Sequence, residues 1–191
     1  AYFEEGMRRL DVNRFVPVGI IIGDVDGLKL VNDTLGHKAG DSMLMAAAEI
    51  IKESFRGSDV AARVGGDEFA ILLPNSNRAV VESACRRMRD AISKRNASHL
   101  DLPISLSIGF SISGEKSITM NDLYKEADHN MYREKLHSGQ NTRKSMVHTL
   151  KKALEDRDFM TEGHANRLKA LMTTFASTMG LSKHVTEDLL L

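Results

Sequence analysis

Alternating hydrophobic and polar positions are clearest between residues 104 and 113, where Ile, Leu and Phe alternate with Ser and Gly. A period of two predicts a β-strand with one packed face and one small, polar face. The apolar run Val18–Val25 ends in acidic residues, which predicts a buried strand that delivers carboxylates at its C-terminal edge. Two further runs, Val60–Val64 and Phe69–Leu73, flank Gly65-Gly66-Asp67-Glu68 and predict a hairpin with acids at an exposed turn.

Apolar residues at helical spacing predict three helices among these strands. One extends from Asp41 to about Phe55, the second covers residues 81–92, and the third covers residues 123–131. Thr119 and Asp122 have capping-box spacing at the start of the third helix. The order β-α-β-β-α-β-α predicts an α+β fold: a ferredoxin-like βαββαβ antiparallel sheet with helices on one face.

The C-terminal part of the chain has a different pattern. Polar residues and a glycine at Ser138–Thr142 predict a boundary, which gives one domain at residues 1–141 and a helical fragment at residues 142–191. The fragment is expected to hold two helices, one through Met146 and Ala153 and one ending near Gly180. Two helices with apolar stripes cannot bury both stripes by themselves, so this extension must pack on something else.

Composition narrows the function classes. Lys plus Arg equals Asp plus Glu at 26 each among 191 residues, so no overall field attracts nucleic acid or an anionic membrane. Cys85 is the single cysteine, which excludes a disulfide framework and favours a reducing, cytoplasmic location. No apolar run reaches the ~20 residues of a membrane helix. Because the chain begins at Ala1 without an initiator Met, we expect a longer protein, whose other regions include any membrane anchor.

Four acids carry the candidate chemistry. Asp24 and Asp26 end the first strand, and Asp67 and Glu68 lie at the hairpin tip, so the ferredoxin-like order predicts that both clusters meet at one edge of the sheet. Crowded carboxylates without His or Cys favour Mg²⁺, which usually completes its shell with substrate phosphates. The alternative is a solvated acidic rim. The residues of the expected loop 27–36 offer backbone N–H groups that suit a phosphate.

Together, the segments Arg63–Phe69 and Asp24–Asp41 resemble the GGDEF family of diguanylate cyclases, in content, order and spacing. The resemblance covers residues 1–141. It implies a sheet of the nucleotide cyclase type and the condensation of two GTP molecules into cyclic di-GMP and two pyrophosphates. It also implies a homodimer that contributes one GTP per subunit.

The resemblance implies which residues bind the metal and do the chemistry. Asp24 and Asp67 are expected to bind Mg²⁺, or Mn²⁺ in its place, with help from the Val25 carbonyl. Either Asp67 or Glu68 is expected to accept the proton of the attacking ribose 3′-hydroxyl. Lys29 is expected at the reacting phosphate; its alternative is a surface lysine at a strand–loop junction.

Contacts with the substrate are implied in the same way. Lys135 is expected to bind the phosphates, while Asn32 and Asp41 are expected to read guanine, whose N1–H and 2-amino donors suit a carboxylate. The alternatives are a turn residue for Asn32 and a helix cap for Asp41. Gly65 and Gly66 lack a Cβ, so they permit either a tight hairpin or close approach of a ligand.

The resemblance also implies an inhibitory site for the product, and the C-terminal residues resemble a second family. Arg56 and Asp59 occupy the register of the family's inhibitory Arg-x-x-Asp site for cyclic di-GMP, and Arg87 is a candidate second arginine on a neighbouring helix. Thr149–Asp158 and Thr161–Arg167 resemble the opening helices of an HD-GYP phosphodiesterase, whose metal-binding His-Asp pair would lie beyond Leu191. The alternative function is therefore a silent GGDEF module that binds GTP or cyclic di-GMP and regulates an attached hydrolase.

Overall fold

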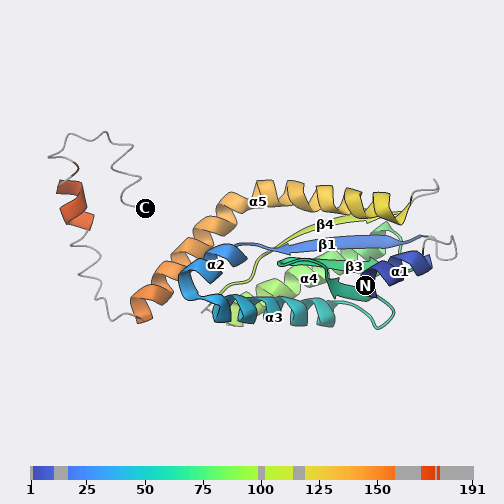
Figure 1. The fold of residues 1–191 in the computed structure, drawn as a ribbon, viewed down its shortest axis with the longest axis horizontal. Coiled ribbons are helices and arrows are strands. Elements are labelled where there is room, and N and C mark those ends of the chain that lie inside the picture. Colours follow the sequence, from blue (N-terminus) through green and yellow to red (C-terminus); the bar gives the residue numbers. More distant parts are fainter. Residues whose placement is uncertain are drawn as a thin grey trace. The chain divides into compact units, whose positions relative to one another are not determined.

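The computed structural model describes residues 2–10, 17–98, 102–113, 119–157, 169–174 and 176 (Figure 1). The chain divides into two compact units, residues 1–149 and residues 150–191. The first unit contains the sheet and the candidate site. In the second unit, residues 169–174 and 176 are helical, while Thr161–Arg167, including His164, lies outside the described residues.

A four-stranded antiparallel sheet forms the centre of the first unit. Its strands are β1 (Gly19–Val25), β2 (Val60–Arg63), β3 (Glu68–Leu73) and β4 (Leu106–Ile112), and they lie in the order β2-β3-β1-β4. This is the expected ferredoxin-like sheet of an α+β fold. The long β-branched strand β1 is buried over its whole length, because it pairs with β3 on one side and β4 on the other.

Helices cover both faces of this sheet, which corrects the expectation of helices on one face. The helices α1 (Tyr2–Leu10) and α5 (Met120–Arg157) enclose one core with β1 and β3. On the opposite face, α4 (Arg78–Ser98) presses Val81 against Gly19 of β1, and α3 (His37–Ser54) packs beside α4. Figure 1 shows α5 and α3 on opposite sides of the strands. The sheet therefore packs against helices on each of its two faces.

The small, polar face predicted for β4 is buried. Ser107 and Ser111 are 1% and 4% exposed, and the Ser111 hydroxyl donates to the Leu123 carbonyl of α5 at 2.6 Å. At Gly109, a Cβ would lie 2.0 Å from the backbone nitrogen of Met131. Small residues on this face thus let α5 approach the sheet at backbone distance.

The segment expected to be a phosphate-binding loop is mostly helix. The helix α2 (Leu28–Leu35) begins after Gly27 and ends at Gly36, and both glycines have positive φ, 73° and 84°. Within it, the Val31 amide donates to the Gly27 carbonyl at 3.0 Å. Because the later amides bond within the helix, only those of the first turn stay available to an anion.

The helix α5 continues without a break through Ser138–Thr142, where a boundary was expected, and the first of the two expected C-terminal helices is its continuation. The assignment of residues 142–191 to a separate domain stays a prediction. At the start of α5, Thr119 caps the helix as the capping-box spacing predicted, because the Asp122 amide donates to the Thr119 hydroxyl oxygen at 3.1 Å. No helix in the described part of the chain has the length and apolarity to cross a bilayer.

Candidate active site

The two acidic segments meet, as the sequence predicted. Asp24 at the end of β1 is the register partner of Glu68 at the start of β3. One residue further, the Val25 amide donates to the Asp67 carbonyl at 2.9 Å. A strand end and a hairpin tip separated by about 40 residues of sequence are thus joined by backbone bonds at one edge of the sheet.

Asp24 is the more buried of the two carboxylates predicted to bind the metal, and it already has a cationic partner. Its carboxylate accepts a hydrogen bond from the Lys135 ammonium of α5 at 2.7 Å. Burial raises the pKa of Asp24, and the hydrogen bond and charge of Lys135 oppose this rise without cancelling it. Burial also lowers the pKa of Lys135, but the hydrogen bond and charge of Asp24 outweigh that effect, so this pKa lies above its usual value.

The residues at this edge fit a divalent cation that shares its shell with a substrate. The Lys135 ammonium stands in for a cation at Asp24, and the charges of Asp67 and Asp26 further raise the pKa of that carboxyl group. Among the described residues, no three His, Cys, Asp or Glu side chains gather closely enough to hold a metal alone. A hard ion with one or two carboxylate ligands and phosphate oxygens as the others matches this set.

The hairpin turn is held in shape by Arg63, whose role the sequence reasoning missed. Its guanidinium donates to the carbonyls of Gly65, at 3.2 Å, and Gly66, at 2.5 Å. Neither glycine has positive φ. A Cβ on Gly65 would lie 2.7 Å from a carboxylate oxygen of Glu68, whereas a Cβ on Gly66 would meet nothing within 4 Å. A Cβ at residue 65 would therefore push the flexible Glu68 carboxylate aside, whereas Gly66 leaves open space where a ligand can approach.

Asp26 lies in the same acidic cluster but has a structural set of partners. Its two carboxylate oxygens accept hydrogen bonds from the hydroxyls of Ser105 and Ser107, both at 2.7 Å. Its backbone amide also donates to the Ser105 carbonyl at 3.0 Å. The residue is 7% exposed and connects the turn after β1 to the start of β4. Two serines at alternate positions of a predicted strand were the only sequence signal for this arrangement.

The residues predicted to read guanine lie on packed helices. Asn32 is in α2, and Asp41 follows Gly40 inside α3, so neither reading as a turn residue or helix cap is correct. A Cβ on Gly40 would lie 2.0 Å from the Asn32 side-chain oxygen, so the two helices meet at this amide. Lys29 is exposed in the first turn of α2, rather than at a strand–loop junction.

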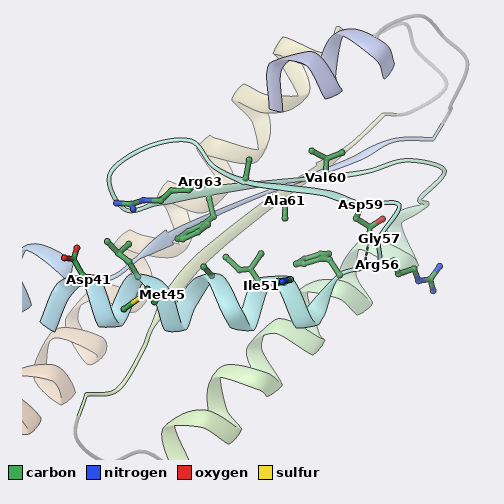
Figure 2. A pocket seen from close by; sticks show the side chains of 15 residues that line it. Asp41, Met45, Ile51, Arg56, Gly57, Asp59, Val60, Ala61 and Arg63 are labelled. Carbon is green, nitrogen blue, oxygen red and sulfur yellow. Dashed lines mark hydrogen bonds between the residues drawn. The ribbon is translucent and has the colours of Figure 1, made fainter. Parts of the chain in front are cut away.

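The predicted inhibitory pair forms a closed turn at the end of a groove. The Asp59 carboxylate accepts from the Arg56 amide at 2.9 Å, and the Asp59 amide donates to the Arg56 carbonyl at 3.0 Å. Figure 2 shows these residues at one end of a groove of about 1040 Å³ between α3 and β2, with Asp41 at the other end. Arg87 of α4 donates to the Ser54 carbonyl beside this turn, at 3.1 and 3.3 Å from its two nitrogens.

Comparisons with known proteins identify the family of this chain. The family described as "Diguanylate cyclase, GGDEF domain" matches residues 2–142. The chain is 37% identical over 126 residues to diguanylate cyclase DgcS of Shewanella oneidensis, covering 65% of this chain and 40% of that protein. It is 32% identical over 120 residues to diguanylate cyclase A of Treponema denticola, covering 62% of this chain and 32% of that one.

A solved structure is similar over the same region. The GGDEF domain of TpbB from Pseudomonas aeruginosa has 33% sequence identity and a TM-score of 0.61, covering 71% of this chain and 83% of that chain. The chain belongs to the GGDEF family. It spans well under half the length of the curated relatives just named, so these similarities describe the GGDEF portion of those proteins.

Proposed function

We propose that this protein is a diguanylate cyclase that condenses two GTP molecules into cyclic di-GMP and two pyrophosphates. The observation that carries the proposal is the backbone bond from Val25 to Asp67 beside the buried carboxylate of Asp24. It places two carboxylates and a turn with an open glycine at one edge of the sheet. Membership of the GGDEF family and its curated cyclases supports the same reaction.

The roles in metal binding and catalysis are assigned to residues at the edge of the sheet. Asp24, Asp67 and the Val25 carbonyl would hold Mg²⁺, or Mn²⁺, which supplies charge stabilisation at the α- and β-phosphates when bound. Asp67 or Glu68 accepts the proton of the ribose 3′-hydroxyl as its oxygen bonds to the α-phosphorus of the second GTP. The bond from that phosphorus to the bridging oxygen then breaks, and pyrophosphate leaves. Lys29 is assigned to the reacting phosphate.

Binding of GTP is assigned to three helices, α5, α2 and α3, besides the hairpin. Lys135 of α5 contacts the phosphates, and Gly66 leaves room for them beside the turn. Asn32 and Asp41 accept from or donate to the guanine edge, with Asp41 accepting from N1–H and the 2-amino group. Because each domain holds one GTP, two copies of the chain face each other as a homodimer in the reaction.

Product inhibition is assigned to the turn at the end of α3. Arg56 has an exposed side chain, and the turn that Asp59 closes presents it outward. A guanidinium stacks on and hydrogen-bonds guanine, so this turn suits cyclic di-GMP. The Arg87 guanidinium lies next to it but is already bonded to Ser54, which makes it a support of the turn.

A second candidate function concerns the C-terminal residues. Their resemblance to the opening of an HD-GYP phosphodiesterase favours a GGDEF module that binds nucleotide without turnover and regulates an attached hydrolase.

A turnover assay separates the two functions. Purified protein with Mg²⁺ and GTP is expected to release cyclic di-GMP and pyrophosphate in a ratio of one to two, measured by chromatography. Asp67→Asn is expected to lose at least about 100-fold in rate. Asp90→Asn, an exposed acid of α4, is the matched control and keeps the parent rate. Bound GTP without product over hours contradicts the cyclase and favours the silent module.

A further inference from the structure

The contact between Lys135 and Asp24 places a lysine on the carboxylate that the proposed reaction needs for its metal. The ammonium nitrogen lies 2.7 Å from one carboxylate oxygen. The Asp24 side chain is only 6% exposed, whereas the Lys135 side chain is 40% exposed. The lysine is therefore the more exposed partner and occupies one oxygen of a carboxylate that has little other contact with solvent.

Lys135 and a divalent ion compete for the Asp24 carboxylate. Two cations within bonding distance of one buried carboxylate repel each other strongly, because little water screens them. The backbone of Asp24 is fixed in a strand paired on both sides, and its side chain is only 6% exposed. Lys135 has a flexible side chain with one side toward solvent, so the ammonium is the group that moves.

If the Lys135 ammonium leaves Asp24, it needs another anion as its ion-pair partner. In the apo domain the candidates near Lys135 are Asp67 and Asp26, whose charges also act on it. Asp26 already accepts two serine hydrogen bonds, and Asp67 is itself assigned to the metal. A triphosphate brings the missing negative charge, because its oxygens bind both an ammonium and a divalent ion.

We infer that Lys135 blocks the metal site of Asp24 until GTP arrives, and that it then transfers from the carboxylate to the triphosphate as the metal enters. The inference rests on the proposed function of Asp24 and Lys135. It makes metal binding depend on nucleotide. Without GTP the divalent ion must displace a lysine whose other nearby acids are either bonded to serines, as Asp26 is, or assigned to the metal, as Asp67 is. With GTP the triphosphate accepts the displaced ammonium. Lys135 is thus a positioning residue that sets the order of binding, besides contacting the phosphates.

The inference predicts effects of opposite sign from one substitution. Without nucleotide, Lys135→Met is expected to bind Mn²⁺ at least fivefold more tightly than the parent, measured by electron paramagnetic resonance of the free ion. The same variant is expected to bind GTP at least fivefold more weakly, measured by calorimetry. Lys135→Arg keeps a cation at Asp24 and is expected to keep the weak metal affinity of the parent.

Two controls make the result specific. Lys125→Met removes a lysine charge from an exposed position on the same helix and is expected to leave Mn²⁺ affinity unchanged. In an Asp24→Asn background, Lys135→Met is expected to give no gain in Mn²⁺ affinity. Circular dichroism checks that each variant is folded.

The outcome that overturns the inference is unchanged or weaker Mn²⁺ binding by Lys135→Met without nucleotide, since a lysine that only contacts phosphate gives that result. An equal gain in Lys125→Met would also overturn it, because general electrostatics would then explain the effect. These titrations measure the binding of Mn²⁺ and GTP and do not measure product formation. Failure of the proposed cyclase reaction shows in the product assay instead, so the two failures are distinguishable.

Discussion

The Val25 amide donates to the Asp67 carbonyl at 2.9 Å, which ties the end of the central strand to the tip of the GGDEF hairpin. This bond holds the two predicted metal-binding segments at a fixed separation without using either carboxylate. Their alignment is therefore set by the backbone and does not depend on contacts of the carboxylates. Substitutions that loosen the hairpin should impair the site without removing any assigned catalytic group.

Arg63→Ala tests the rigidity of the hairpin. The variant loses two hydrogen bonds to the Gly65 and Gly66 carbonyls, so we expect a fall of about 1 kcal/mol in the free energy of unfolding. Misplacement of Asp67 should lower kcat about tenfold or more. Urea unfolding and steady-state kinetics measure the two effects. Arg86→Ala, an exposed arginine of α4, is the control, and equal kinetics for both variants would contradict the assignment.

Gly40→Ala tests the position of Asn32. A methyl group at residue 40 would lie 2.0 Å from the Asn32 side-chain oxygen, so the amide must move away from its present place. We expect KM for GTP to rise about threefold to tenfold, the size of one lost hydrogen bond, with a smaller change in kcat. A KM equal to that of the parent would exclude Asn32 in this orientation from binding guanine.

Arg56→Ala tests product inhibition. The exposed guanidinium is removed, while the Asp59 carboxylate can still accept from the backbone amide of residue 56 and close the turn. We expect turnover to continue at cyclic di-GMP concentrations that stop the parent, with the initial rate unchanged. Product titration during turnover measures this, and Lys52→Ala in the same groove is the control. Identical inhibition curves for Arg56→Ala and the parent would remove the turn from the inhibitory role.

Gly109→Ala tests the close packing of α5 on the sheet. The added Cβ would lie 2.0 Å from the Met131 nitrogen and 2.2 Å from the Ala127 carbonyl oxygen, and backbone cannot yield as a side chain can. We expect a loss of about 3 kcal/mol or more in the free energy of unfolding. Gly23→Ala on the adjacent strand is the control, because its Cβ would meet nothing within 4 Å. Similar losses in both variants would disprove the contact.

Cys85 provides a pH test. Burial raises the pKa of its thiol to about 11, from an ordinary value of 9.0. A thiol whose pKa is raised in the folded state contributes stability that is complete below pH 9.0 and lost as the pH rises through about 11. Relative to Cys85→Ala, the parent should therefore lose unfolding free energy over this window and none near pH 7. A thiol reagent should modify Cys85 at pH 8 only after unfolding; rapid labelling of native protein would contradict this.

Several features of the fold followed from local sequence. The β-branched run of β1 and the two runs around Gly65-Gly66 gave their strands directly, because such residues suit a pleated, buried surface. The meeting of Asp24 with Asp67 followed from strand order alone. These features depend on neighbours along the chain or on a common topology.

Other features depend on tertiary packing that periodicity does not report. The helix α2 is short and bounded by two glycines, so its polar residues resembled a loop. The helix α5 tolerates Gly139, since one glycine costs a helix about 1 kcal/mol and does not end it. The pair of Lys135 and Asp24 spans 111 residues, and only the docking of α5 on β4 brings it together.

The Lys135 ammonium acts as an internal counter-ion for Asp24, and it bears on whether the domain needs a bound metal to fold. Where folding depends on a bound ion, removal of that ion unfolds the chain. Here the ammonium of Lys135 offsets the buried carboxylate of Asp24 from the moment the last helix docks on the sheet. We therefore expect the GGDEF domain to fold without a bound divalent ion.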